Sequence, residues 1–151
     1  APPPAPRPAG PEPFRMIMGD FRFDDRTMEP TRIDRVVRTG SVEQWEIGNR
    51  GGIPHNFHVH GAAFQVLDAD GEPPAPYLTG EKDTVYVPPG TTIRLRVRFL
   101  AHSDVRSPYM FHCHVLAHED AGMMGQFLTV SAQDEPLVPA DLTDAHVGHG
   151  K

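Results

Sequence analysis

Two short segments concentrate the residues that bind metal ions in proteins. Together they hold six of the nine histidines and the only cysteine of the 151-residue chain. Their sequences are HNFHVHG, residues 55–61, and HCHVLAHEDAGM, residues 112–123. Imidazole, thiolate and thioether groups suit a soft metal ion such as copper. The spacing within each segment then decides which side chains can meet at one ion.

Alternation along an extended chain separates these side chains into two sets. Residues two apart in a strand point to the same face, whereas direct neighbours point to opposite faces. The first predicted set combines nitrogen and sulfur donors: His55, Cys113, His118 and Met123. The second predicted set contains only imidazoles: His58, His60, His112 and His114. For the first set to assemble, the segment after residue 114 must be a loop that returns over the strand end.

Each set suits a different site. Two imidazoles and a thiolate with a weak axial thioether are typical of an electron-transfer copper, whereas four imidazoles on one surface suit copper, zinc or iron. Ligand type alone leaves zinc open for the first set, although zinc gains little from a thioether. Cys113 is a poor hydrolytic nucleophile with His114 as its base, because adjacent strand residues diverge. Surface histidines unrelated to metal are the remaining interpretation, and the offset between the two sets argues against it.

Short strands are expected to position both segments. Residues 93–99 alternate apolar and charged at every step, which is the period of a half-buried strand. Other runs rich in β-forming residues are 32–38, 42–47, 63–67, 84–87, 109–115 and 126–130. Turn sequences such as Pro88-Pro89-Gly90 separate them, and no long segment has a helical period. Six to eight such strands predict an all-β fold, a Greek-key β-sandwich or small barrel.

Composition divides the chain into one domain and two flanking segments. Residues 1–13 hold seven prolines and predict an extended linker. Residues 14–133 form the predicted domain, and residues 134–151 are expected to be a polar tail in which His146 and His149 are solvated. Met124, next to a predicted ligand, is expected in the core.

Charge and composition also narrow the partners and the compartment. The formal net charge of −6 argues against nucleic acid or an anionic membrane as partner. No apolar run approaches the roughly 20 residues of a membrane-spanning helix, so we expect a soluble chain. A single cysteine excludes an internal disulfide. A copper thiolate is best preserved outside the reducing cytosol, which favours a periplasmic or secreted location.

The two histidine segments resemble the C-terminal cupredoxin domain of bacterial multicopper oxidases, near the laccases and cuprous oxidases. The resemblance covers about residues 14–131 and includes the stretches KDTVYVPPG and PYMFHCH. It implies a Greek-key sandwich of the cupredoxin type. It also implies a type 1 copper with His55, Cys113 and His118 as ligands and Met123 in the axial position.

The resemblance assigns the remaining histidines to a trinuclear copper cluster. It makes His58 a ligand of the type 2 copper, and it assigns the type 3 pair to three residues: His60, His112 and His114. Electrons from a reducing substrate would pass through Cys113 to the cluster, where dioxygen is reduced to water. Glu119 matches a proton-relay position, although a solvated loop carboxylate explains it equally well. Asn56 stands where the family commonly has proline.

The cluster of this family takes eight histidines from two domains, whereas this chain offers four. Three hypotheses follow: a domain of an oxidase that needs an N-terminal cupredoxin partner, a blue-copper electron-transfer module without oxygen chemistry, or a symmetric oligomer that rebuilds the cluster between copies. Reducing substrates of the family are phenols, aromatic amines, and cuprous or ferrous ions. The chain has no methionine-rich insert, which favours a laccase-like phenol oxidase.

Overall fold

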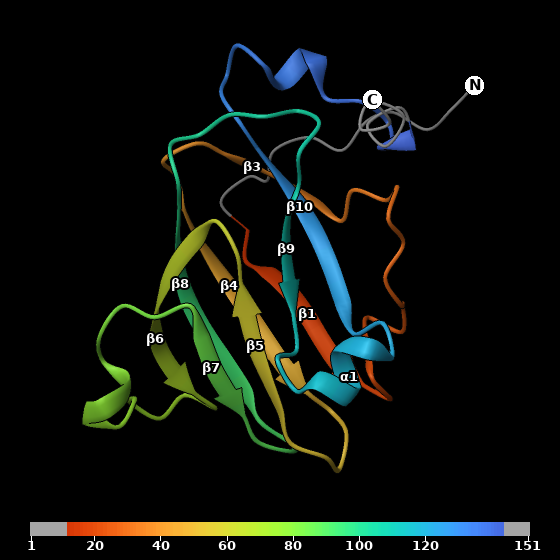
Figure 1. Cartoon of the computed structure of the whole chain (residues 1–151). Helices are drawn as coiled ribbons and strands as arrows, with labels where there is room; N and C mark the ends of the chain where they lie inside the picture. Colours follow the sequence, from red (N-terminus) through yellow and green to blue (C-terminus); the bar gives the residue numbers. More distant parts are fainter. Residues whose placement is uncertain (1–11, 144–151) are drawn as a thin grey trace.

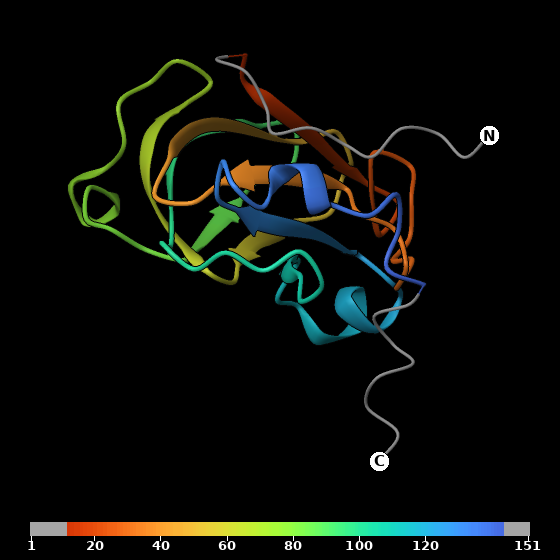
Figure 2. The same cartoon turned by 90° about the horizontal axis from the view of Figure 1, so that it is seen from above.

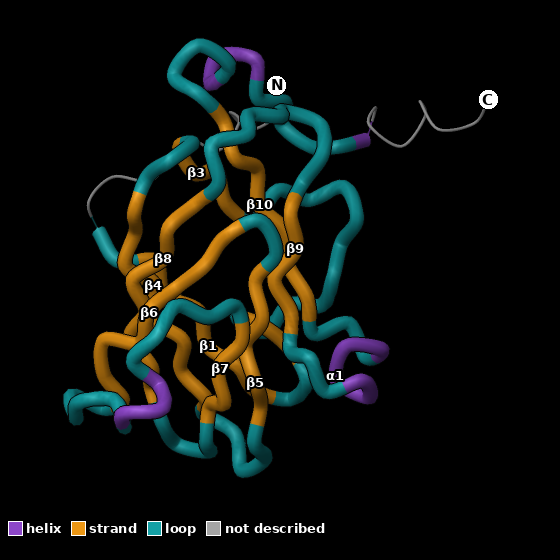
Figure 3. Tube along the Cα trace, turned by 60° about the vertical axis from the view of Figure 1, so that its left-hand side comes forward, coloured by secondary structure: helices purple, strands orange, loops and turns teal. Residues whose placement is uncertain are grey.

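Alternating buried and exposed side chains build the strands of this chain. In β8 (Thr92–Phe99) the apolar residues are buried and the three arginines between them are exposed. The computed structural model describes residues 12–143. Within that range it contains ten strands, one five-residue α-helix and two 3-10 turns, so nearly all regular structure is strand (Figure 3).

The strands form two five-stranded sheets, which lie as two layers when seen from above (Figure 2). The first sheet has the order β2-β1-β4-β8-β6, with strands β1 (Phe14–Gly19), β2 (Arg22–Phe23), β4 (Val42–Asn49), β6 (Ala62–Ala69) and β8. The second has the order β3-β10-β9-β5-β7, with strands β3 (Arg35–Arg38), β5 (His55–Val59), β7 (Thr84–Val87), β9 (Tyr109–His112) and β10 (Met124–Val130).

Consecutive strands from β4 to β9 alternate between the two sheets. Such crossing connections are typical of Greek-key sandwiches, and they confirm the all-β prediction. The connections η1 (Pro76–Leu78) and η2 (Glu135–Leu137) are single turns. Among residues 12–143, no helix has the length and apolar character needed to cross a lipid bilayer.

An aromatic core fills the space between the sheets. The buried Trp45 ring lies 5.6 to 6.1 Å, centroid to centroid, from four phenylalanine rings: Phe57, Phe99, Phe111 and Phe127. Aromatic pairs at these separations add to the stability gained from burial. Cys113 and Met123 belong to the same buried cluster, so both predicted sulfur donors are part of the core.

Sequence patterns did not predict every strand, and they placed the ends of others differently. β1 and β2 were not predicted, because FRMIMG lacks a clean polar alternation. β9 ends at His112, short of the predicted residue 115, because the chain turns away there and Cys113 N–H bonds the Met123 carbonyl. The expected loop after His114 contains a helix, α1 (Leu116–Asp120), which lies beside the ends of β9 and β10 (Figure 1).

The first half of the expected polar tail packs on the fold. Val138 and Leu142 are buried in a second apolar cluster, and the Leu142 N–H bonds the Thr31 carbonyl. Residues 134–143 are therefore part of the domain, not a solvated tail. The rest of the tail, with His146 and His149, and the predicted linker up to residue 11 lie outside the described residues.

Close packing fixes the contact between β9 and β10. Gly125 lies opposite Phe111 in the antiparallel ladder, and a methyl group at Gly125 would come within 2.2 Å of the Phe111 ring. Only glycine permits this approach. Met124, which was expected in the core, is only half-buried beside it.

Candidate metal centre

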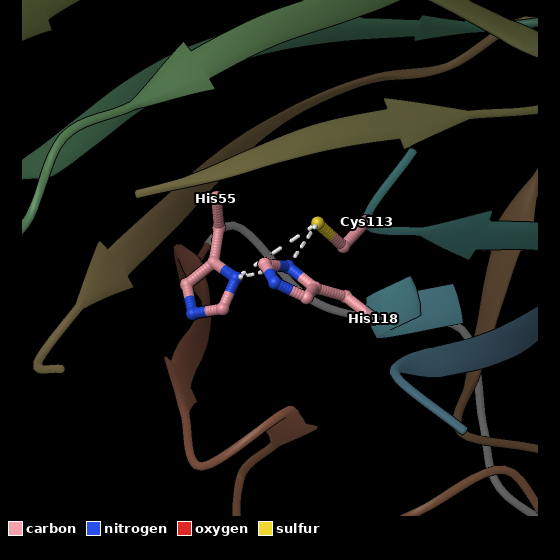
Figure 4. A group of neighbouring side chains, drawn as sticks. All are labelled: His55, Cys113 and His118. Atoms are coloured by element: carbon pink, nitrogen blue, oxygen red, sulfur yellow. Dashed lines mark hydrogen bonds between the residues drawn. The ribbon is translucent and has the colours of Figure 1, made fainter. Parts of the chain in front are cut away.

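Three separate elements bring the first donor set together. His55 opens β5, Cys113 follows the end of β9, and His118 lies in α1 (Figure 4). All three are nearly inaccessible, with exposed fractions of 3% for His55, 0% for Cys113 and 8% for His118. The structure thus joins residues that are up to 63 positions apart in the sequence.

The donor atoms of this set converge on one point. Cys113 Sγ lies 3.5 Å from His118 Nδ1 and 3.9 Å from His55 Nδ1, and the two Nδ1 atoms are 3.1 Å apart. Each residue offers one donor atom, and all three atoms lie within 4.8 Å of one another. Figure 4 shows both rings turning a nitrogen towards the sulfur.

Burial favours the neutral form of His55, which is the form that can bind a metal cation. Desolvation, followed by the proximity of His118, lowers the pKa of His55, so its imidazole is neutral at neutral pH and keeps a free lone pair. A buried cysteine and two buried imidazoles match the nitrogen and sulfur ligands of an electron-transfer copper site. This donor set fits copper.

Backbone hydrogen bonds hold Met123 next to two members of the first donor set. The Met123 N–H donates to the His118 carbonyl at 3.1 Å, and the Met123 carbonyl accepts from Cys113 N–H at 3.2 Å. The segment from Cys113 to Met123 is therefore a closed turn that carries three of the four predicted ligands. The Met123 side chain is fully buried.

The second set gathers on the opposite side of β9. His58 lies directly opposite His112 in the β5–β9 ladder, so both side chains share one face. His60 Nε2 lies 3.1 Å from His112 Nε2, and single donor atoms of His58, His60 and His112 fall within 4.8 Å of one another. Partial desolvation, followed by the neighbouring imidazoles of His58 and His112, lowers the pKa of His60, although this side chain is exposed.

His114 stands at the edge of this second set. Its side chain is exposed, and its ring centroid is 5.2 Å from those of His58 and His112. The close group of three does not include it. Cys113 and its two neighbours therefore diverge as the alternation predicts, even though the strand ends at His112.

Hydrogen bonds fix the orientation of two imidazoles. His58 Nδ1 lies 2.9 Å from the Asp83 carbonyl and 2.9 Å from Thr84 Oγ1, and His112 Nδ1 lies 3.1 Å from the Cys113 carbonyl. A carbonyl accepts only from a protonated nitrogen, so each Nδ1 carries the hydrogen and each Nε2 is free to bind a metal. Sequence spacing did not reveal Asp83 and Thr84, because they lie on a different strand segment.

Glu119 lies on the side of the second set. Its Oε2 atom is 3.6 Å from His112 Nδ1, and its side chain is 30% exposed. The carboxylate therefore neighbours the ring nitrogen that does not face the other imidazoles. The contact places Glu119 beside one member of the second set, and its role as a proton relay stays a prediction.

Asn56 contacts one residue of each donor set. Its Oδ1 atom accepts the backbone N–H of His114 and lies 3.7 Å from Cys113 Sγ. The proline common at this position in the family has no such acceptor. The asparagine therefore fixes the backbone between the two sets.

Comparisons with known proteins agree with this geometry. The sequence profile of the multicopper oxidase family matches residues 5–133. The multicopper oxidase mco of Staphylococcus haemolyticus is 44% identical over 102 residues, which cover 65% of this chain and 22% of that protein. A laccase of Haloferax volcanii is 39% identical over 115 residues, which cover 70% of this chain and 19% of that protein.

Solved structures show the same fold. The crystal structure of a multicopper oxidase from Pediococcus acidilactici has a TM-score of 0.75 and 32% identity, covering 88% of this chain and 29% of that chain. This chain therefore spans about a fifth to a third of the length of these relatives. Fold, donor sets and sequence profile agree: the chain belongs to the multicopper oxidase family.

Proposed function

We propose that this domain accepts electrons from a reducing substrate at a type 1 copper and passes them to a trinuclear copper cluster that reduces dioxygen to water. The observation that carries the proposal is the convergence of Cys113 Sγ with His55 Nδ1 and His118 Nδ1 in a buried site. These residues would hold a type 1 copper, with Met123 as a further, weaker ligand. Copper supplies one-electron redox chemistry there, and oxygen reduction at the cluster.

The second set contributes half of the cluster. His58 would hold the type 2 copper, and His60, His112 and His114 would hold the type 3 pair. The other ligands come from an N-terminal cupredoxin domain of the same oxidase, which fits the small share of the relatives' length that this chain covers. Two exposed members, His60 and His114, face outward where such a domain would dock.

The chain's own bonds connect the two sites. Cys113 is covalently joined to His112 and His114, and its carbonyl also bonds His112 Nδ1. This covalent path would connect a copper held by Cys113 with coppers held by His112 and His114. The Glu119 carboxylate, 3.6 Å from His112 Nδ1, is the side chain placed to move a proton beside the second set.

Substitution of the thiol tests the type 1 site. We expect the chain loaded with copper to absorb strongly in the visible range, and Cys113→Ser to lose this band together with about one copper ion per chain. His102→Ala, at an exposed histidine outside both sets, is the matched control and should retain both. A visible band that survives in Cys113→Ser refutes the ligand assignment.

Two other functions remain distinguishable by experiment. About one copper per chain with intense colour and no oxygen uptake would identify an electron-transfer module. Additional copper that rises with dimer formation in sedimentation would identify a symmetric copy as the partner, because two copies supply eight histidines. Oxygen uptake that requires the N-terminal domain supports the oxidase.

We further propose a periplasmic or secreted location and a small phenolic reductant. A copper thiolate is best preserved outside the reducing cytosol. The absence of a methionine-rich segment from the sequence argues against cuprous ions as the reductant. Cell fractionation of the source organism tests the location, and a cytosolic pool would contradict it.

A further inference from the structure

Part of the connection between β2 and β3 packs against the turn that carries Met123. Residues 27–34, the 27–34 segment, contain no strand or helix. Met28 N–H donates to the Gly122 carbonyl at 2.9 Å, and the same carbonyl accepts Met124 N–H at 2.9 Å. The segment is therefore bonded to the residue directly before Met123.

Gly122 brings the segment and the turn into direct contact. Its φ angle is 93°, a conformation that favours glycine, and a methyl group there would lie 3.2 Å from Thr27 Cβ. No side chain of Gly122 separates the two backbones. Because Met123 is also bonded to His118 and Cys113, the turn is held by the first donor set and by the segment.

The Gln126 side chain attaches the segment to β10. It is 3% exposed, and its Nε2 atom donates to the carbonyls of Pro30 and Arg32, both at 2.8 Å, and lies 3.5 Å from that of Glu29. The backbone adds two bonds, because Asp34 N–H donates to the Gln126 carbonyl at 3.0 Å and Asp34 Oδ2 accepts Gln126 N–H at 2.9 Å. One buried residue therefore holds most of the segment.

The C-terminal part of the domain holds the segment from another element. Leu142 N–H donates to the Thr31 carbonyl at 2.8 Å. Ile33 is buried in the same apolar cluster as Val138 and Leu142. The segment therefore has bonds or packing contacts on both sides of its central turn, and it can hold Gly122 in one position.

We infer that Gln126 is a positioning residue for Met123: it fixes the 27–34 segment, and the segment holds the turn at Gly122 so that the Met123 side chain keeps one buried position. The inference rests on the proposed function, in which Met123 is the weaker copper ligand. A thioether that is held less firmly donates less to the oxidised ion, so loss of the Gln126 bonds should raise the reduction potential of bound copper.

Amide hydrogen exchange tests this role in the copper-free chain. In the parent chain, the amides of Met28, Met123 and Met124 should open in one step with the same dependence on urea. Gln126→Met sets an apolar side chain of similar length against the three carbonyls. It should speed exchange at these amides by about tenfold more than at the amides of β8. Ile93→Val, which weakens the core at β8, is the control and should not favour the three amides.

Reduction potentials of the copper-loaded chain test whether Gln126 acts through Met123. Met123→Leu removes the thioether, and Gln126→Met should shift the potential in the same, positive direction, equivalent to about a tenfold change in the ratio of Cu(I) to Cu(II) affinity. In the Met123→Leu background, Gln126→Met should cause no further shift, because the group on which it acts is gone. Ile93→Val should leave the potential unchanged.

The outcomes separate this inference from the proposed function. Equal shifts by Gln126→Met in both backgrounds would overturn the inference, and so would Met28 and Met123 amides that open independently in the parent chain. The second result needs no variant, so the test stays valid if Gln126→Met does not fold. A visible band that survives in Cys113→Ser would refute the proposed function, whereas the exchange results on the copper-free chain would stand.

Discussion

At the residue scale, the orientation of each imidazole is set by what its second nitrogen contacts. His58 and His112 both direct Nδ1 at backbone carbonyls, so Nε2 of each is left for a metal. Outer partners of this kind raise metal affinity because they hold the ring in one tautomer and one orientation. Thr84 is such a partner, since its Oγ1 lies 2.9 Å from His58 Nδ1.

Removal of the Thr84 hydroxyl should weaken the second site. In a Cys113→Ser background, which isolates the imidazole set, we expect Thr84→Val to lower copper affinity by about tenfold, because the Asp83 carbonyl still holds His58. A competition titration with a chelator measures the affinity. Thr92→Val, on the exposed side of β8, is the control. Equal affinities for Thr84→Val and the parent chain would show that the hydroxyl does not support the site.

The sequence predicts the donor residues better than it predicts the residues that hydrogen-bond to them or pack on them. Alternation separates Cys113 from His112 and His114, because two-residue periodicity is a local property of an extended chain. Asp83 and Phe21 reach the donors through tertiary contacts across strands, which no local pattern encodes. The five-residue helix that carries His118 is too short to show a helical period.

At the element scale, the β1–β2 turn is strained, because Asp20 and Phe21 both have positive φ angles, 49° and 57°. A non-glycine residue in the left-handed region costs roughly 1 to 2 kcal/mol. We therefore expect Phe21→Gly to be more stable than Phe21→Ala by about 1 kcal/mol, although glycine usually destabilises. Both variants lose the ring, so the comparison isolates the backbone. Urea unfolding measures the difference, and an alanine variant of equal or higher stability would contradict the strain.

The β6–β8 pair carries a pH-sensitive contact. Asp68 Oδ2 accepts from Arg94 Nε at 2.6 Å, and this bond is the main reason that the pKa of the Asp68 carboxyl falls below its ordinary 3.8. A carboxyl with a lowered pKa adds stability above pH 3.8, and the contribution disappears as pH falls through the folded-state pKa.

Replacement of Asp68 should therefore flatten the acid side of the stability curve. We expect Asp68→Asn to melt at a lower temperature than the parent chain at pH 7, and the two to converge as pH falls well below 3.8. Thermal unfolding at several pH values measures the gap. A gap that stays constant down to strongly acidic pH would show that ionisation of Asp68 is not its cause.

At the scale of the whole molecule, the core and the first donor set are one unit. Cys113 and Met123 belong to the buried cluster around Trp45, so most of the packing exists without a metal. The sandwich was predictable because strands such as β8 alternate cleanly. The packed end of the chain was not, because Val138 and Leu142 are isolated apolar residues in a polar segment.

Copper should therefore stabilise a chain that is already folded. We expect the copper-free chain to unfold cooperatively above room temperature, and copper at about 1,000 times its dissociation constant to add about 4 kcal/mol. Scanning calorimetry with copper, and again after a chelator is added, measures the difference. A copper-free chain that is unfolded at room temperature would show that the metal is required for folding.

The thiol of Cys113 lies between two residues that serve the other donor set. A strand that slips by one residue exchanges its two faces. A single inserted or deleted residue between Phe111 and His114 would therefore deliver the sulfur to the imidazole cluster and an imidazole to the sulfur site. Natural variants of this stretch should differ by replacement alone, whereas length changes are tolerable in the exposed connection between β6 and β7.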